Sequence, residues 1–564
     1  MASSKSPTGP GVFEADAVLG LLKLLQEATR ATPEGGPHTY VPPTGGEIAE
    51  ADYHHFVFGQ RGSGKSSLLR HLQSQMIEQS RAAVWIDQEI FSNLQYPDVL
   101  VSAVYALMGD ISRSLAKRVP QPKKPSLIDR LLRKKDPVSD EARLLGEMQF
   151  AVGELEKLKF APLDRKIEWV VVDQTDAKVS GSAGIKVELV SLQASGETSN
   201  RLSTTATEII EGSKEQFLER ALPTFRELLS RAARILNGGF VFVDDLYQLR
   251  RLDQPLVLGY LHRLVKDTGV WLKIGSIRYS TVTFRPGDPP RGMQVGHDAH
   301  EVPLDRGLRH FQSTQDFLER ILSGIAEGLD VDIYELLTPD ARKRLVLAAG
   351  GVARDYLRLT SGAINEARNR GVTTKPGSHR VIVEDVNKAA GLLSPSKFED
   401  LRKDEPEEAA TLEAVVRKLT EFCRVTKAAY FLVPTDDAKL SDQINKLQHL
   451  RFTHLLAESE TVPNEGSRRF NVWFLDVAEL SAQRATQGMD FLGWESREKR
   501  RNRKLIFTGT VPETESASKS KSQTRGAKKT VDATSVDTIS SAGAGKVQAE
   551  ALFDSLDGNT ARDE

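Results

Sequence analysis

The stretch Gly59-Gln60-Arg61-Gly62-Ser63-Gly64-Lys65-Ser66 decides the fold of this chain. It has the spacing Gly-x-x-x-x-Gly-Lys-Ser/Thr, in which the glycines let successive backbone N–H groups turn toward one anion. The apolar run 55–58 before it predicts a short buried strand, and apolar residues at helical spacing over 66–77 predict a helix whose N-terminus adds positive charge. We therefore expect a polyphosphate to bind through the loop, whose contributing residues are Gly59, Gln60, Arg61, Gly62, Ser63, Gly64, Lys65, Ser66 and Ser67.

Length and composition limit the classes of protein to consider. At 564 residues the chain is too long for one core, and three or four units are expected. Its 76 Lys and Arg residues nearly balance its 77 Asp and Glu residues, so no overall field points to nucleic acid or membrane. The single cysteine, Cys423, excludes a disulfide framework and a multi-cysteine zinc site. Residues 1–10 have no apolar signal core, and no apolar run approaches the ~20 residues of a membrane helix, so we expect a cytoplasmic protein with no membrane partner.

A second motif fits the same chemistry. The apolar strand predicted at 239–244 ends in Asp244 and Asp245, as a Walker B motif requires. Asp244 is expected to hold the hydration shell of Mg²⁺ while Ser66 binds the ion directly, and Asp245 is expected to polarise the attacking water. Alone this pattern is weak, because apolar strands often end in Asp, but the loop upstream strengthens it.

Two further positions are candidates for contact with a nucleotide. The strand predicted at 269–278 ends near Ser276 and Arg278, which we expect to sense a γ-phosphate, unless they merely end the strand. Arg354 lies in the first turn of a helix after Gly350 and Gly351. A cation is disfavoured at a helix N-terminus, so Arg354 indicates an anionic partner, although an exposed arginine would also fit.

Other segments complete the predicted organisation. An amphipathic helix is expected over 15–29, and the loop that follows holds Tyr40, Val41 and Pro42, which either cover a nucleotide base or simply connect. The second strand and helix are predicted at 82–87 and 97–107. The segment from 116 to 213 is expected to be an insertion, with a basic stretch at 116–135, a β-hairpin at 167–172 and 185–190 and a loop at 200–212. A helix is expected after it, at 214–236.

The C-terminal half is predicted to be mainly helical at first. Helices are expected at 317–329, 339–349 and 352–369, and helices followed by a hairpin between 405 and 494 predict a winged helix. Its recognition helix, 440–449, has a thin basic face, so a structural role is favoured over DNA reading. A basic run follows at 497–504, and the Ser/Thr/Lys-rich composition after 512 predicts disorder, with 552–557 either a docking motif or inert.

The predicted fold is therefore an α/β P-loop NTPase core, a parallel sheet flanked by helices, with an inserted β-hairpin, an α-helical lid, a winged-helix domain and a disordered C-terminal tail. The expected domains are an N-terminal helix and loop at 1–48, the core at 49–304 with its insertion at about 116–213, the lid at 305–395, the winged helix at 405–494 and a basic, disordered tail at 495–564.

Taken together, these motifs resemble the AAA+ and STAND superfamilies of P-loop ATPases over about residues 40 to 500. Within them the chain looks most like the replication-initiator-like (origin-recognition-like) branch and its prokaryotic relatives, some of them encoded in antiviral defence systems. The resemblance implies that Arg354 is the lid arginine and that Ser276 or Arg278 is the first sensor, so the implied catalytic set is Asp245, Lys65, Arg354, Ser276 and Arg278. Asp245 replaces the usual glutamate, which suggests slow hydrolysis. An arginine finger cannot be chosen among Arg263, Arg285, Arg291 and Arg309.

Three functions compete, all with ATP and Mg²⁺ as cofactors. In the first, a slow ATPase uses lid closure as a switch for assembly with itself or with a partner protein of a multi-component system. In the second, the same machine loads onto DNA through the winged helix and the basic run 497–504. In the third, the site binds nucleotide without turnover in a scaffold, against which the intact Lys65, Ser66, Asp244 and Asp245 argue. The sequence does not separate the first two.

Overall fold

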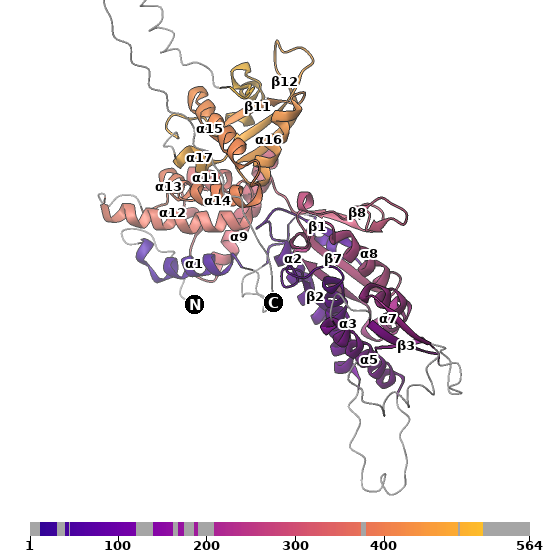
Figure 1. Cartoon of the computed structure of the whole chain (residues 1–564). Coiled ribbons are helices and arrows are strands. Elements are labelled where there is room, and N and C mark those ends of the chain that lie inside the picture. Colours follow the sequence, from indigo (N-terminus) through magenta and orange to yellow (C-terminus); the bar gives the residue numbers. More distant parts are fainter. Residues whose placement is uncertain are drawn as a thin grey trace, which may run out of the picture. The chain divides into compact units, whose positions relative to one another are not determined.

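The computed structural model describes residues 12–30, 40–43, 45–119, 139–161, 167–173, 185–189, 208–373, 379–482 and 486–510, with the backbone alone at 167–173, 185–189, 208–211 and 371–373 (Figure 1). All of these residues belong to one compact body, Met1–Val511. Three predicted features lie outside the described residues: the Ser/Thr/Lys-rich segment after 512, the motif at 552–557 and most of the basic stretch 116–135.

The core is a five-stranded parallel sheet in the order β10-β1-β7-β6-β2. The strands are β1 (His55–Phe58), β2 (Ala82–Asp87), β6 (Gly239–Asp244), β7 (Val270–Ser276) and β10 (His300–Pro303). Apolar side chains dominate the strands, as expected of a parallel sheet covered on both faces. Because all strands run in one direction, the phosphate loop after β1 and the carboxylates that end β6 meet at one edge.

Helices cover both faces of this sheet (Figure 1). On one face, α2 (Lys65–Glu78) buries Leu68 and Leu69 against Phe242. The other face carries α3 (Asp98–Arg118), α5 (Asp140–Phe160), α7 (Lys214–Leu236) and α8 (Gln254–Val265). The prediction for α7 is confirmed at both ends, α3 is longer than the predicted 97–107, and α5 and α8 were not predicted. Charged residues interleaved with the apolar positions of α5 obscure its helical period.

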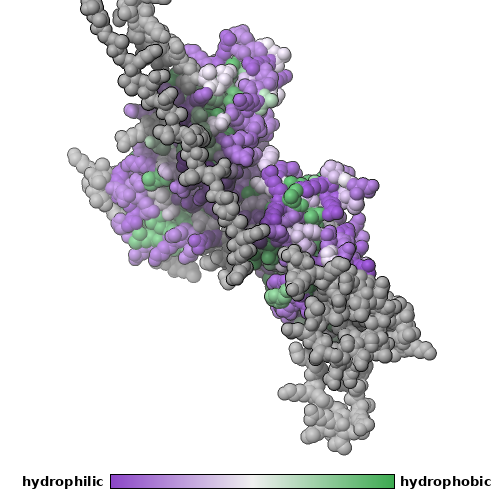
Figure 2. All heavy atoms as spheres, viewed as in Figure 1, coloured by the Kyte–Doolittle hydropathy of each residue, from purple (hydrophilic) through white to green (hydrophobic). Residues whose placement is uncertain are grey.

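One helix, α3, bears on the expectation that no apolar run approaches membrane-spanning length. Within the described residues, α3 alone is long and apolar enough to span a bilayer, with a mean hydropathy of 1.3. Two-thirds of that window is buried, and α3 packs against α5, α7 and β2. The apolar side chains of α3 therefore pack inside the core. The face shown in Figure 2 is mainly hydrophilic, with apolar residues in small patches.

The insertion contains a small antiparallel sheet in the order β4-β3-β5. The two segments predicted as a hairpin are β3 (Ile167–Asp173) and β4 (Ile185–Leu189), which pair with each other. On its other side β3 pairs with β5 (Glu208–Gly212), so the loop predicted over 200–212 is wrong for its last five residues. Ile209 and Ile210, between glutamates, give that segment the apolar pair that a strand needs.

The lid is a bundle of helices that includes the N-terminal helix. It consists of α9 (Phe311–Glu327), α10 (Ile333–Leu336), α11 (Pro339–Ala349), α12 (Ala353–Thr373) and α13 (Val383–Gly391). The N-terminal α1 (Asp16–Glu27) packs against α9 and α12 (Figure 1). Its Val18, Leu21 and Leu25 are buried in the same core as Leu318 and Leu322. The segment expected to form a separate N-terminal unit is therefore built into the lid.

The C-terminal unit combines helices with a three-stranded antiparallel sheet in the order β11-β13-β12. Its elements are α14 (Ser394–Asp404), α15 (Ala409–Thr426), β11 (Tyr430–Pro434), α16 (Ala438–His449), β12 (Thr453–Thr461), β13 (Arg469–Leu475) and α17 (Val477–Ala482). Between β11 and β12, where every residue is described, α16 is the one helix. The winged-helix assignment stays a prediction.

Residues 486–510, in part expected to be disordered tail, are folded onto this unit. The basic run contains the short helix α18 (Arg497–Arg500). Phe507 is fully buried against Phe422 and Phe431, and its N–H donates to the carbonyl oxygen of Leu432 at 2.8 Å. An apolar anchor after the basic residues therefore extends the folded unit to about residue 510.

Candidate nucleotide site

The phosphate loop has the backbone that its glycines predict. It follows β1 directly, and Gly62 and Gly64 have φ angles of 89° and 98°, which L side chains rarely adopt. Gly64 is the N-cap of α2, so the N–H groups of the first helical turn point to the loop. A Cβ at residue 62 would lie 2.8 Å from Cβ of Arg354, so this glycine also allows the lid to approach.

Lys65 lies over the loop with its ammonium group buried. The residue is 5% exposed, and Nζ donates to the carbonyl oxygens of Gly59 at 2.9 Å and Gln60 at 3.0 Å. Burial lowers the pKa of Lys65, while the carboxylates of Asp245, Asp244 and Asp305 act in the opposite direction. The charge is thus held at the centre of the loop.

The two carboxylates at the end of β6 occupy different environments. Asp244 is 5% exposed and hydrogen-bonds with the Ser66 side chain, and burial together with Asp245 raises the pKa of Asp244 to about 6. Gly275 on β7 makes room for it, since a Cβ there would lie 2.8 Å from Oδ1 of Asp244. Asp245 has left-handed backbone angles (φ 53°, ψ 40°), and its N–H donates to Oδ1 of Asp244 at 3.0 Å. The oxygen atoms of Ser66 and Asp244 suit Mg²⁺, as predicted.

Tyr247 joins the site without having been predicted. Its hydroxyl hydrogen-bonds with Asp245 and with Arg61 of the loop, and burial raises its pKa. Its ring centroid lies 5.9 Å from Nζ of Lys65. Another unpredicted partner is Asp305, whose Oδ1 accepts the Gln60 N–H at 2.6 Å. No sequence pattern marks these positions, because both contacts depend on where the chain returns to the loop.

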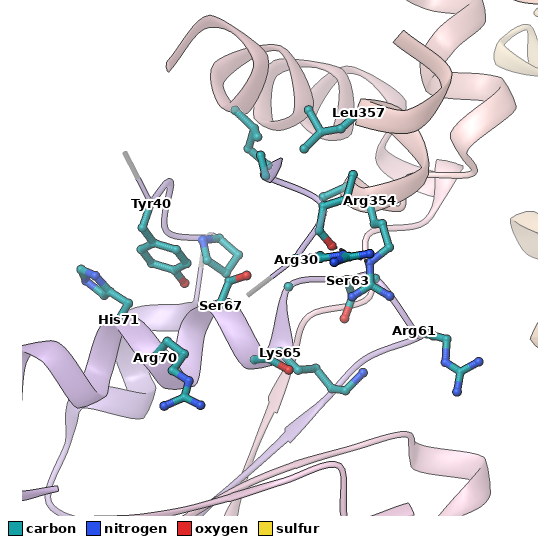
Figure 3. A pocket seen from close by; sticks show the side chains of 18 of the residues that line it. Arg30, Tyr40, Arg61, Ser63, Lys65, Ser67, Arg70, His71, Arg354 and Leu357 are labelled. Atoms are coloured by element: carbon teal, nitrogen blue, oxygen red, sulfur yellow. Dashed lines mark hydrogen bonds between the residues drawn. The ribbon is translucent and has the colours of Figure 1, made fainter. Parts of the chain in front are cut away.

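A cavity of about 780 Å³ opens above the loop, within the usual size range of ligand pockets (Figure 3). The lid contributes an apolar wall of Phe317, Ile321, Ile325 and Leu357. Tyr40, Val41 and Pro43 form another wall, where the Tyr40 ring stacks on His71 with centroids 4.4 Å apart. Of the three residues proposed to cover a base, Tyr40 and Val41 line the cavity and Pro42 does not.

Two polar atoms at this cavity fit a ligand. Oη of Tyr40 and Oγ of Ser63 are buried and make no hydrogen bond within the described part of the chain. An unpaired buried hydroxyl costs about 1–3 kcal/mol. A nucleotide, which carries many acceptor atoms, supplies partners of the required kind, so the cavity and its lining fit the predicted ATP.

Arg354 connects the lid to the loop. Its backbone N–H donates to the carbonyl oxygen of Gly62 at 3.2 Å, and its Nε donates to the carbonyl oxygen of Thr29 at 3.1 Å. The side chain lines the cavity (Figure 3). The structure therefore brings Arg354 to the place that an anion partner requires.

Ser276 and Arg278 are not brought to the cavity. Oγ of Ser276 bonds Oγ1 of Thr281 at 2.5 Å. Arg278 pairs with Glu301 and lies over the Phe58 ring. Successive strand residues face opposite sides, so Gly275 faces Asp244 and Ser276 points away. A sensor role for either residue stays a prediction.

The candidate arginine fingers remain undecided. Arg263 forms a two-bond pair with Glu219 and Arg309 pairs with Glu458, while Arg285 donates to the Arg251 carbonyl oxygen. None of the four predicted residues lines the described cavity.

Comparisons with known proteins add little to this geometry. No protein-family model matches the chain. No curated protein matches it. Among solved structures, it is similar to a Walker-type ATPase of Pyrococcus abyssi, at 12% identity and a TM-score of 0.39, over 79% of this chain and 96% of that chain. The chain's own parallel sheet and the glycine-rich loop after β1 form a P-loop NTPase core.

Proposed function

We propose that the chain is an ATP-binding, slowly hydrolysing ATPase of the AAA+ and STAND type, in which nucleotide-dependent closure of the lid is a switch. One observation carries the proposal: a buried Lys65 faces Asp244 and Asp245 in a cavity whose other wall, including Arg354, belongs to the lid. The output is assembly of the chain with itself or with a partner protein of a multi-component system.

The chain's own residues supply binding and orientation. The N–H groups of residues 62–66 and Lys65 bind the β- and γ-phosphates. Ser66 and Asp244 hold Mg²⁺, which when bound neutralises charge on the phosphate oxygens. Asp245 orients a water and accepts its proton, held in place by Tyr247. Because the carboxylate of Asp is one methylene shorter than that of Glu, we expect slow turnover.

Contacts between the lid and the C-terminal unit support the switch. Asp355, next to Arg354, pairs with Arg451 of the C-terminal unit at 2.5 Å. Gly350, in the turn before α12, has φ 58° and lies so close to His454 that a Cβ would collide with the imidazole ring. His454 in turn bonds Asp476, which pairs with Lys397. A displacement of Arg354 by a γ-phosphate is therefore coupled to residues of the C-terminal sheet.

The charges of the C-terminal unit favour this proposal over a DNA loader. Arg500 pairs with Glu460 at 2.6 Å and Arg503 with Glu465 at 2.6 Å. On α16, Lys446 is shared between Glu408 and Asp442. Cations that are already paired inside the protein have less to gain from a phosphate backbone.

The experiment is calorimetric titration of the full chain with ATP in Mg²⁺. We expect one site per chain, and we expect Lys65→Ala to weaken ATP binding at least about 100-fold, since the loop loses its buried ammonium group and the charge-assisted hydrogen bonds of that group. Lys266→Ala, an exposed lysine of the core, is the matched control. Equal affinity in Lys65→Ala would contradict the proposal, and binding without phosphate release would select the scaffold.

A further inference from the structure

Five cationic side chains line the cavity: Arg30, Arg61, Lys65, Arg70 and Arg354. Four of them have protein partners. Arg61 bonds Tyr247, Lys65 bonds loop carbonyls, Arg70 lies 3.4 Å from the Trp85 ring centroid, and Arg354 bonds Thr29. The guanidinium of Arg30 makes no hydrogen bond or ion pair with any described residue. It is thus the cavity cation most available to a ligand.

The backbone places Arg30 at the cavity. It ends the short turn after α1, where its N–H donates to the carbonyl oxygen of Glu27 at 3.0 Å and the Thr29 hydroxyl donates to that of Gln26 at 2.7 Å. Arg30, Arg354 and Ser63 line the same cavity and overlap in the view of Figure 3, and Nε of Arg354 contacts Thr29, the residue before Arg30. The neighbouring Thr29 carbonyl takes one N–H of Arg354 and leaves its terminal nitrogens for another acceptor.

The helix before this turn is packed on the lid. The apolar face of α1 is buried against α9 and α12. At the start of α1, Glu14 accepts two hydrogen bonds from Arg368 on α12, at 3.1 and 2.9 Å. Whatever displaces α12 relative to the loop therefore carries Arg30 and Arg354 together.

The positive charge around the loop favours binding of a polyanion. Arg30, Lys65 and Arg354 line one cavity, and the like charge of Arg354 is among the causes that lower the pKa of Lys65. Glu27 and Glu89 at the rim are the acidic counterparts besides Asp245. A triphosphate, with several charged oxygens in a row, is the ligand that engages the loop and both arginines at once.

We propose that Arg30 is a second phosphate-binding arginine of the lid, which contacts the terminal phosphate of a nucleoside triphosphate together with Arg354. The N-terminal helix is thereby part of the element that distinguishes triphosphate from diphosphate. The inference rests on the proposed nucleotide site and adds to it a residue and a helix that lie outside the phosphate loop and the carboxylates.

The test compares ATP and ADP binding by calorimetry in Mg²⁺ for the wild-type chain and for Arg30→Ala, Arg30→Lys and Lys23→Ala. Lys23 is an exposed cation on α1 and serves as the matched control. A hydrogen bond to a charged group corresponds to roughly 10- to 100-fold in affinity, and the exposure of Arg30 places it near the lower value. We expect Arg30→Ala to lose about tenfold for ATP and less than about threefold for ADP, Arg30→Lys to keep part of the affinity, and Lys23→Ala to match wild type.

Other outcomes separate the inference from its foundation. Unchanged ATP affinity in Arg30→Ala, or an equal loss for ATP and ADP, would overturn the contact with the terminal phosphate. An equal loss in Lys23→Ala would assign the effect to the general charge of α1 and overturn it as well. A wild-type chain that binds no ATP would instead overturn the proposed function. Thermal unfolding of Arg30→Ala, expected at the wild-type midpoint, shows that the lid still folds.

Discussion

Two buried lysines lie at opposite ends of the same strand pair, and one has a structural role while the other lies at the candidate nucleotide site. Lys65 follows the carboxyl end of β1, and Lys273, on β7, pairs in register with His55 at the amino end. Both are almost completely buried, at 5% and 0% exposure. Their surroundings differ in whether the polar groups are satisfied by the protein or face a cavity.

At the amino end the protein provides every partner of the lysine. Nζ of Lys273 donates to the carbonyl oxygens of Ala51 and Tyr53, at 2.6 and 3.0 Å, and lies 3.0 Å from Nδ1 of His55. The neighbouring His54 accepts the Leu272 N–H. Burial lowers the pKa of Lys273 to about 7. These contacts give the amino group of Lys273 three partners from the protein itself.

At the carboxyl end the polar groups surround an opening. Lys65 faces three carboxylates, and Oγ of Ser63 and Oη of Tyr40 line the cavity without a partner among the described residues. The two lysines are therefore equally buried but differ in role, since Lys273 is part of the folded core and Lys65 is part of the candidate site. A change at the carboxyl end should alter binding and turnover, and a change at the amino end should alter stability.

The largest effect is expected from Asp245→Asn. The amide no longer accepts a proton from the attacking water, and general-base catalysis typically contributes 10²- to 10⁴-fold. We expect turnover, measured as phosphate release, to fall by about this factor while ATP binding and the free energy of unfolding stay close to wild type. Undiminished turnover would mean that another residue is the catalytic base, and it would contradict the catalytic role given to the carboxyl end of the sheet.

The next prediction tests the contact between the lid and the C-terminal unit, where Gly350 lies against His454. Gly350→Ala introduces a left-handed alanine, which costs roughly 1–2 kcal/mol, and a collision with His454, which adds about 1–3 kcal/mol. Gly466→Ala is the control, because Gly466 has a similar φ of 62° and nothing within 4 Å of its would-be Cβ. Denaturant unfolding should show a larger loss for Gly350→Ala, and equal losses would mean that the contact with His454 carries no energy.

Lys273→Met tests the amino end through pH. The pKa of Lys273 is about 7 in the folded chain and near 10.4 when unfolded, so between these values the unfolded state binds more protons and stability rises with pH. One proton gives at most about 1.4 kcal/mol per pH unit. Urea unfolding from pH 7 to 9 should lose this slope in Lys273→Met while ATP affinity is kept. A slope that survives would assign the titration to another group.

The smallest effect is expected from Arg500→Ala in the basic run. Because Arg500 is paired with Glu460, its loss should change the salt dependence of any duplex DNA binding by less than about one unit of log–log slope. Removal of residues 497–564 would be a less specific test, because the deletion also removes buried Phe507. A slope lower by a full unit would make Arg500 a phosphate contact and revive the DNA loader.

Local patterns predicted what local residues determine. The glycine spacing predicted the loop, and apolar periodicity predicted α7 and α11 with correct ends. What depends on the return of distant segments was missed. The edge strand β10 is only four residues long, and α1 shows its apolar face in the sequence but not its partners α9 and α12. Tyr247 and Arg30 carry no motif, and only the folded chain shows them at the cavity.

The most direct measurement of the central claim, that the lid recognises a terminal phosphate above the loop, is the ratio of ATP to ADP affinity in Arg354→Ala. We expect ADP affinity to stay nearly unchanged and ATP to weaken by roughly 1.5–3 kcal/mol, the range for a hydrogen bond to a charged group, with any ATP-dependent assembly lost. Equal losses for both nucleotides would mean that Arg354 supports the fold or binds an inner phosphate. No loss for either would contradict the switch.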